Sequence, residues 1–278
     1  MSEIQTDIIN NEFLSSADIA LSEEFMSQGY SIVSIEDVPG LERIRSSIVK
    51  SCVRYLKCDD PQDTGMFLNK INNQLDVSRL NDFRLNAIDT INSKEWFRPT
   101  YYKLARSSLE TLVGNELSMQ RRINMSIQFP GDDSSLLPIH CDVWSGDSPF
   151  EVVLWIPLVD CFGTKSMFIV PPKINAQIQE RWHEFNGRSS DALFEAVEND
   201  LIWVDIPFGK ALIFNQNLMH GNRINNEQET RWTLNCRFKG AFTPYADKRI
   251  GEFFEPITLR AASRIGLCYN LPNEKKSK

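Results

Sequence analysis

The chain has 278 residues, of which 42% are hydrophobic and 24% are charged, and its formal net charge is −7. These proportions are typical of globular proteins and exclude intrinsic disorder for most of the chain. An acidic chain repels phosphate backbones, and the sequence contains no basic patch, so we expect neither nucleic-acid binding nor insertion into a membrane. The longest strongly apolar run, 152–159, is far shorter than the ~20 residues that cross a bilayer.

The ends of the chain and its cysteines bear on where the protein works. The first 13 residues contain early acidic side chains and no apolar stretch, so they do not read as a secretory signal. The six cysteines are scattered without a C-x-x-C pair, which argues against a disulfide scaffold or a cysteine-rich zinc site. We therefore expect reduced thiols and a cytoplasmic location. The final residues, 273–278, are predicted to be disordered.

The first part of the chain has the apolar periodicity of helices. Apolar side chains recur at three- and four-residue steps from Leu41 to Tyr55 and again from Ala105 to Val113, which places them on one face of an amphipathic helix. The stretch between them, 67–96, is rich in Asn and has a less regular helical pattern. We predict a helical N-terminal layer over residues 1–118.

From Arg122 onward the apolar period changes to two, as in strands. The predicted strands are 122–129, 151–159, 166–170, 201–206, 210–220 and 231–239, and a turn at 207–209 is predicted to join the fourth and fifth into a hairpin. The strand 151–159 is apolar on both faces, as in the centre of a buried sheet. A helical insert over 174–200 interrupts the series.

This order of elements predicts one domain, mainly β with helices. The strands of 119–240 form a β-sandwich or barrel core, which the N-terminal helices wrap. The remaining residues, 241–278, are assigned to a C-terminal lid and tail.

Two predicted strands carry a polar face where a barrel interior normally takes apolar side chains. The polar residues are Asn124, Ser126 and Gln128 on the first strand, and Arg231, Thr233, Asn235 and Arg237 on the last. Burying such groups without partners costs about 1–3 kcal/mol each. These faces therefore either lie in solvent or line a polar pocket that binds a charged ligand.

Three histidines are present, and two of them have the spacing of a metal site. His140 and Asp142 stand two residues apart, so in an extended segment they point to the same side. His220 lies at the end of a predicted strand. Two imidazoles and one carboxylate form the facial triad of non-haem iron sites, which leaves other coordination positions open. On spacing alone, ordinary core or surface histidines explain the pattern equally well; His183 is expected on a helix surface.

Taken together, these motifs resemble those of iron(II)- and 2-oxoglutarate-dependent oxygenases of the phytanoyl-CoA-hydroxylase-like group. The likeness covers roughly residues 120–270 and rests on H-x-D at His140, the strand VVLWIPLVD, the run KSMFIVPP, the stretch GKALIFNQNLMHGNRIN around His220, and RWTLNCRF, which begins with Arg231. The segments HCDVWSGDSPFEVVLWIPLVD and FNQNLMHGNRINNEQETRW are most similar to a bacterial subfamily, the sporadic carbohydrate cluster oxygenases.

The resemblance implies a double-stranded β-helix, the jelly-roll fold of the cupins, with iron(II) held by His140, Asp142 and His220. The cosubstrate 2-oxoglutarate would chelate the metal, while its far carboxylate pairs with Arg231 beside the hydroxyl of Thr233. The implied reaction decarboxylates 2-oxoglutarate to succinate, consumes O2 and oxidises the substrate, most commonly by hydroxylation.

Four further residues are candidates for the cosubstrate pocket. The resemblance implies Trp155 and Asn222, and strand alternation suggests Asn124 and Gln128, for which a solvated strand face is the alternative. Related enzymes sometimes use a lysine near Lys165, but with an arginine present we expect that side chain at the surface.

The substrate is implied only by the subfamily. Its gene neighbourhoods point to a small carbohydrate or sugar-nucleotide intermediate in surface-polysaccharide or related carbohydrate biosynthesis. Candidate substrate contacts are Trp144, Asn217, Arg237 and Asp147. Trp144 equally suits a residue packed on the barrel rim, and Arg237 either binds a phosphate or closes the far end of the barrel. The segment 252–266 is assigned to a lid over the opening.

Two other functions stay open at this point. A cupin-like metal-dependent sugar epimerase or isomerase would favour H-x-H with a downstream Glu, whereas this chain has H-x-D. A non-catalytic ligand-binding jelly roll is the other, and the complete triad with Arg231 argues against it. A homo-oligomer also stays open.

Overall fold

The computed structural model describes residues 13–272, so the predicted disorder of 273–278 lies outside the described residues. The strands are β1 (Tyr30–Ser34), β2 (Leu117–Gln120), β3 (Asn124–Gln128), β4 (Glu151–Pro157), β5 (Phe168–Ile169), β6 (Ile202–Trp203), β7 (Lys210–Asn215), β8 (His220–Gly221), β9 (Arg231–Gly240) and β10 (Phe254–Pro256). The helices are α1 (Ser16–Gln28), α2 (Val38–Leu56), α3 (Thr64–Asn69), α4 (Leu80–Asn92), α5 (Phe97–Lys103), α6 (Arg106–Val113), α7 (Pro172–Glu180), α8 (Ser190–Glu195) and α9 (Ala261–Leu267).

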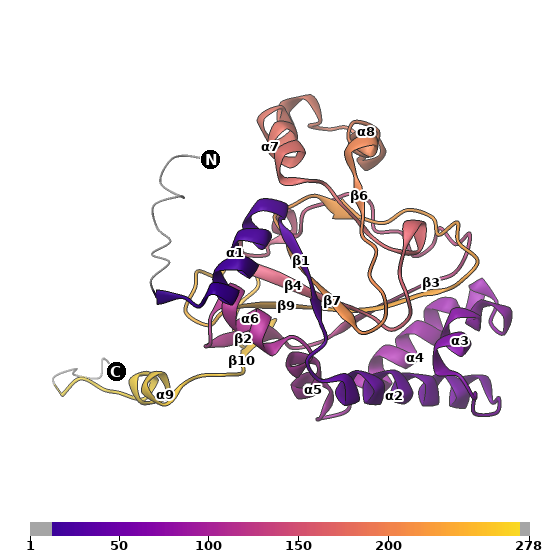
Figure 1. Ribbon diagram of the computed structural model, residues 1–278, viewed down its shortest axis with the longest axis horizontal. Helices are drawn as coiled ribbons and strands as arrows, with labels where there is room; N and C mark the ends of the chain where they lie inside the picture. Colours follow the sequence, from indigo (N-terminus) through magenta and orange to yellow (C-terminus); the bar gives the residue numbers. More distant parts are fainter. Residues whose placement is uncertain (1–12, 273–278) are drawn as a thin grey trace, which may run out of the picture.

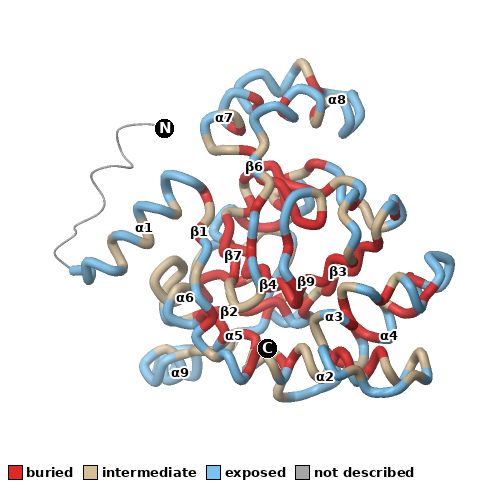
Figure 2. Tube along the Cα trace, turned by 45° about the vertical axis from the view of Figure 1, so that its right-hand side comes forward, coloured by how far each residue is buried: buried red, intermediate tan, exposed pale blue. Residues whose placement is uncertain are grey.

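Two antiparallel sheets face one another in the core. The larger sheet has the order β1-β7-β4-β9-β2-β10, with β3 also paired to β9, and the smaller one has the order β6-β5-β8. Helices α2 to α5 cover the outer face of the larger sheet, and α7 and α8 stand at the other side of the molecule (Figure 1). The most continuously buried part of the trace follows β4, β7 and β9 (Figure 2).

Strand β4 is apolar on both faces because each face packs into a different cluster. Val152, Leu154 and Ile156 belong to the core shared with the helical layer. Val153 and Trp155 point to the opposite side, toward the smaller sheet. The predicted buried central strand is therefore confirmed, since β7 and β9 flank it on its two edges.

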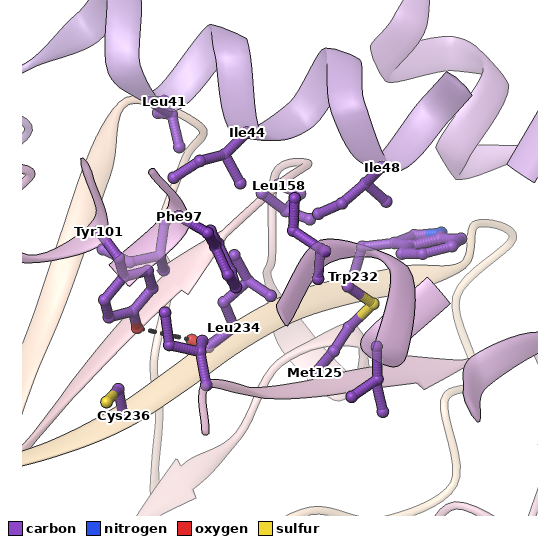
Figure 3. Close-up of a cluster of buried hydrophobic side chains, with 14 of the residues drawn as sticks. Leu41, Ile44, Ile48, Phe97, Tyr101, Met125, Leu158, Trp232, Leu234 and Cys236 are labelled. Carbon is purple, nitrogen blue, oxygen red and sulfur yellow. Dashed lines mark hydrogen bonds between the residues drawn. The ribbon is translucent and has the colours of Figure 1, made fainter. Parts of the chain in front are cut away.

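The helical layer is fastened to the larger sheet by the apolar face of α2. Leu41, Ile44 and Ile48 are fully buried in one cluster with Trp232 and Leu234 of β9 (Figure 3). Each such side chain contributes roughly 1.5–3 kcal/mol on burial. Helix α2 begins where the Asp37 carboxylate accepts a hydrogen bond from Gly40 N at 3.0 Å.

Two sequence predictions about strand pairing are wrong. Residues 201–206 and 210–220 do not form a hairpin, because β6 pairs with β5 in the smaller sheet. Strand β7 has no free edge for it, since β1 occupies one edge and β4 the other. The N-terminal layer is also not wholly helical, because β1 joins the larger sheet.

The C-terminal segment does not close over the opening between the sheets. Strand β10 extends the larger sheet by pairing with β2, and α9 is an exposed helix beyond that edge (Figure 1). This corrects the expected lid over 252–266. The insert 174–200 is mainly helical, with α7 and α8 and two short 3-10 turns. Within residues 13–272, no helix is long and apolar enough to span a bilayer.

Candidate metal centre

The two histidines of the H-x-D and distal positions face each other across a short antiparallel bridge. The backbone N–H of His140 donates to the carbonyl of His220, and the reverse bond is also made, both at 2.9 Å. Asp142 opens a short 3-10 turn (Asp142–Ser145), and its N–H donates to Gln216 O at 3.1 Å. The backbone around all three side chains is therefore held by hydrogen bonds.

Gly221 is required beside this bridge by its surroundings. A Cβ at this position would lie 2.8 Å from the carbonyl oxygen of Leu137 and 3.2 Å from the backbone nitrogen of Ile139. A larger residue would push away the segment that leads to His140.

The three side chains converge as the sequence predicts. The Nε2 atoms of His140 and His220 lie 3.4 and 3.9 Å from Asp142 Oδ1, and the three ligand atoms all fall within 4.8 Å of one another. Each Nδ1 meets a backbone carbonyl, of Pro138 at 2.7 Å and of Leu218 at 2.8 Å. A neutral imidazole that donates through Nδ1 presents the Nε2 lone pair to a metal.

The charges of the cluster also suit a cation. Burial alone would raise the pKa of Asp142, but the hydrogen bond with His140 and the charges of His220 and Arg237 outweigh it and hold that pKa well below its usual range. Burial lowers the pKa of His220 to about 4. Burial would also lower the pKa of His140, but the hydrogen bond with Asp142 raises it overall. Near neutral pH the cluster thus offers an ionised carboxylate and at least one neutral imidazole.

Arg237 is bound to the carboxylate of this cluster. Its Nη2 lies 2.9 Å from Asp142 Oδ1, and its Nε lies 3.2 Å from Asp147 Oδ1 and 3.1 Å from Gln216 Oε1. Asp147 is buried and forms a second ion pair with Lys248. The guanidinium is therefore already engaged by two carboxylates.

A cavity of about 590 Å³ opens between the sheets at this cluster. Nine of the thirteen predicted site residues line it: His140, Asp142, His220, Arg231, Thr233, Trp155, Asn222, Asn124 and Arg237. The polar face of β9, from Arg231 through Thr233 and Asn235 to Arg237, points into the cavity, and so do Asn124 and Ser126 of β3. Of the two interpretations of these polar strand faces, the pocket is the one that the structure bears out.

Arg231 lies in this cavity without an acidic partner. It is 3% exposed, and its Nη1 and Nη2 donate to Ser166 O at 3.0 Å and Ser126 Oγ at 2.9 Å. Its Nε and the Thr233 hydroxyl have no hydrogen-bond partner, and no carboxylate of residues 13–272 forms an ion pair with it. Burial lowers the pKa of Arg231 to about 10, so it stays charged near neutral pH. A buried unpaired cation is costly, and an anion in the cavity would relieve that cost.

Asn222 and Gln128 have structural hydrogen bonds. The Oδ1 of Asn222 accepts from Leu137 N at 2.5 Å, which ties the loop before His140 to β8. Gln128 pairs with Arg231 across β3 and β9 but does not line the cavity, because its Nε2 donates to Arg223 O at 2.8 Å.

Three of the predicted substrate residues, Trp144, Asn217 and Asp147, do not line the cavity. Gly146, with φ of 84°, turns the chain away after the 3-10 turn. Trp144 is 44% exposed and packs on Trp182, with ring centroids 4.8 Å apart. Asn217 donates to Pro149 O at 3.0 Å. Asp147, as described, faces two cations.

Sequence reasoning also misplaced or missed several charged residues. Lys165 is fully buried, not at the surface, and it pairs with Glu229 at 2.7 Å and donates to Asn69 Oδ1 at 2.8 Å. Arg84 on α4 and Arg122 before β3 line the cavity. No local sequence motif predicts that these two arginines line the cavity, because α4 lies beside it only through tertiary packing.

Comparisons with solved structures show that other proteins share this fold. No protein-family model matches the chain, and no curated protein does. Solved structures do match. ThoJ, a non-heme monooxygenase in complex with nickel, is 13% identical, with a TM-score of 0.55 over 87% of this chain and 85% of its own. AviO1 from Streptomyces viridochromogenes is 13% identical, with a TM-score of 0.53 over 84% and 99% of the two chains.

A third structure, EvdMO1, is 14% identical, with a TM-score of 0.53 over 80% of this chain and 50% of its own. At such identities the likeness concerns the architecture. The chain shares its fold with the non-heme monooxygenase ThoJ, and the predicted jelly-roll core with helices is confirmed.

Proposed function

We propose that this protein is an iron(II)- and 2-oxoglutarate-dependent dioxygenase. It oxidises, with hydroxylation as the expected outcome, a carbohydrate or sugar-nucleotide intermediate of surface-polysaccharide or related biosynthesis. One observation carries the proposal: the His140–Asp142–His220 cluster and the buried Arg231, which has no acidic partner within residues 13–272, line the same cavity. A metal and a carboxylate-bearing cosubstrate together would satisfy both.

The donor set fits iron(II). Two imidazole nitrogens and one carboxylate oxygen on one side of a metal leave its other positions open, and this combination is typical of oxygen-dependent non-haem iron sites. His140, Asp142 and His220 would hold the ion. When bound, iron together with 2-oxoglutarate and O2 supplies the oxidising chemistry, which the side chains alone cannot provide.

The chain's own residues bind and orient the cosubstrate. The Arg231 guanidinium pairs with the far carboxylate of 2-oxoglutarate, and the Thr233 hydroxyl, two residues along the same strand face, donates to it. The buried Nε of Arg231 and the buried hydroxyl of Thr233, which have no hydrogen-bond partner within residues 13–272, are then satisfied. Trp155 lies in the cavity wall and helps to exclude water. A charge pair in such a dry site is stronger than one at the surface.

The substrate class and the cellular setting are further parts of the proposal. The carbohydrate assignment rests on the subfamily resemblance of residues 120–270. A cytoplasmic setting is supported by the six unpaired cysteines, of which four are buried.

Succinate release tests this function. Purified protein with iron(II), 2-oxoglutarate and O2 is assayed against a panel of sugars, sugar phosphates and nucleotide-linked sugars. We expect at least one compound to stimulate succinate formation and to gain one oxygen atom. Asp142→Ala should abolish the stimulated rate because it removes a metal ligand at a site that is not part of the apolar core.

The control is Asp82→Ala, which removes an exposed carboxylate of α4 that does not line the cavity. It should keep the wild-type rate. Undiminished turnover by Asp142→Ala would refute the metal assignment.

A further inference from the structure

The cavity is strongly cationic although the chain as a whole is acidic. Its lining contains four arginines and a single carboxylate, Asp142, whereas the net charge of the chain is −7. Arg237 is engaged by Asp142 and Asp147, and Arg231 lies fully buried at the cosubstrate pocket. Arg84 and Arg122 remain to be explained.

These two arginines lie at the mouth of the cavity. Leu85 and Leu137, which line the cavity with them, are 46% and 54% exposed. Arg84 comes from α4 and Arg122 from the turn that precedes β3, so the mouth is built partly by the N-terminal helical layer.

Arg84 is held in place without an ionic partner. Its Nη2 donates to Ser135 Oγ at 2.6 Å, its Nε is buried with no hydrogen bond, and it forms no ion pair within residues 13–272. Asp132 lies behind Ser135, but its oxygens already accept from Ser134 N at 2.9 Å and Ser135 Oγ at 2.8 Å. A guanidinium fixed in this way retains donors for an incoming anion.

The side chain of Arg122 can leave its present ion pair at little cost in free energy. It pairs with Asp89 at 2.7 Å, but the two side chains are 53% and 72% exposed. Exposed ion pairs of this kind contribute little to stability. The side chain can therefore exchange Asp89 for a ligand at the mouth.

The cavity has room for a second molecule beside the cosubstrate. 2-Oxoglutarate has ten non-hydrogen atoms, and at roughly 30 Å³ each, the liquid volume of a water molecule, they fill at most about 300 Å³. The cavity measures about 590 Å³. About half of the cavity volume therefore remains for a second molecule.

We propose that Arg84 and Arg122 form a phosphate-binding site for the primary substrate, with Ser135 holding the Arg84 guanidinium in place. The inference rests on the proposed function and narrows its substrate class to sugars that carry a phosphoryl group. Sugar phosphates and nucleotide-linked sugars both supply that group, and neutral sugars do not. Two guanidinium groups offer the several N–H donors that a phosphoryl group accepts.

Calorimetric titration of pyrophosphate tests the site. The protein is first loaded with one equivalent of nickel(II) and saturated with 2-oxoglutarate, so that the metal and Arg231 are occupied. We expect wild type to bind pyrophosphate, and Arg84→Gln to raise its Kd by about tenfold, the loss of one charge-assisted contact. Arg122→Gln should raise the pyrophosphate Kd by about threefold. Arg84→Lys should raise this Kd less than Arg84→Gln does. Added salt should weaken the binding.

Arg121→Gln is the matched control. Arg121 is the neighbouring exposed arginine, which donates to Gly251 O at 2.7 Å and does not line the cavity. It should change the pyrophosphate Kd less than twofold, and no variant should change the 2-oxoglutarate Kd more than twofold. Separate titrations with glucose 1-phosphate and with UDP distinguish the two sources, since the tighter ligand identifies the part of the substrate that the mouth holds.

Three results would overturn the proposal. The first is that wild type does not bind pyrophosphate, and the second is that all variants bind it with the same Kd. The third is that Arg84→Gln weakens the binding of 2-oxoglutarate and leaves the pyrophosphate Kd unchanged. The last result would assign Arg84 to the cosubstrate. Failure of the proposed function is recognised separately, because wild type would then show no metal-dependent binding of 2-oxoglutarate.

Discussion

Arg231 is the residue whose charge is hardest to explain without a ligand. It is buried, and neither of its two hydrogen bonds is to a carboxylate. A buried charge without a counterion destabilises a protein, whereas an apolar side chain of similar size often does not. The position of Arg231 is therefore better explained by ligand binding than by a contribution to stability.

Arg231→Met separates these two effects. We expect the 2-oxoglutarate Kd to rise at least about tenfold, because a charge-assisted contact of roughly 1.5–3 kcal/mol is lost. The Tm of the ligand-free protein should not fall, because an unpaired buried charge is removed with it. Calorimetry and thermal unfolding measure the two quantities. An unchanged Kd with a lowered Tm would show that Arg231 is structural.

Arg237 contacts the candidate metal site through Asp142. Because its guanidinium lies 2.9 Å from Asp142 Oδ1 and is held by Asp147 and Gln216, we interpret it as a positioning residue rather than a substrate contact. Residues that orient a metal ligand typically contribute ~10- to 100-fold to metal affinity.

Arg237→Met should therefore weaken nickel(II) binding by about that factor. Asp147→Asn, a change outside the cavity lining, should act in the same direction but less strongly. Both are measured by competition with a chelator. If Arg237→Met changed only the KM of the substrate and left the metal Kd as in wild type, the positioning role would be wrong.

At the scale of elements, β4 begins with a buried acid that makes folding sensitive to pH. Glu151 is 2% exposed, and its oxygens accept from Ser148 N at 2.9 Å and Gln216 Nε2 at 3.0 Å. Burial raises the pKa of Glu151 from 4.5 to about 7, although these hydrogen bonds oppose the rise. The folded state therefore holds this proton over a pH range in which the unfolded chain has lost it.

The free energy of unfolding should depend on pH accordingly. Between about pH 4.5 and 7 the folded state binds more protons at this site, so the contribution of Glu151 to stability falls as the pH rises. Glu151→Gln removes that contribution. Its stability relative to wild type should increase by at most about 3 kcal/mol across this range.

Denaturant unfolding at pH 5 and pH 7.5 measures the difference. Glu23→Gln, at an exposed position of α1, serves as the control and should show no such trend. A relative stability of Glu151→Gln that is equal at both pH values would contradict the account.

The helices and strands also show which features could be predicted from the sequence. The alternation of β9 predicts that Arg231, Thr233, Asn235 and Arg237 share a face, and all four line the cavity. Strand β1 escaped notice because five residues, YSIVS, give too short a pattern. The false hairpin had correct turn residues, but pairing partners are chosen by the whole sheet, where β1 and β4 already occupy both edges of β7.

At the scale of the whole molecule, the site is assembled from segments far apart in the sequence. The candidate metal ligands come from residues 140–142 and β8, the arginine proposed to bind the cosubstrate from β9, and the mouth of the cavity from α4 and the 134–137 loop. The H-x-D motif and the distal histidine could be predicted from the sequence because they lie next to strands with a recognisable pattern. Arg84 could not be predicted, because its position in the cavity depends on how the helical layer packs against the sandwich.

The central claim is that one cation and one carboxylate-bearing cosubstrate meet in this cavity. Anaerobic titration of the metal-free protein with iron(II) and 2-oxoglutarate tests it directly, by the visible charge-transfer absorption of the chelate. We predict a band that saturates at one equivalent of iron in wild type and in Asp82→Ala, and that is lost in Asp142→Ala. A band of equal strength in Asp142→Ala, or none in wild type, would contradict the claim.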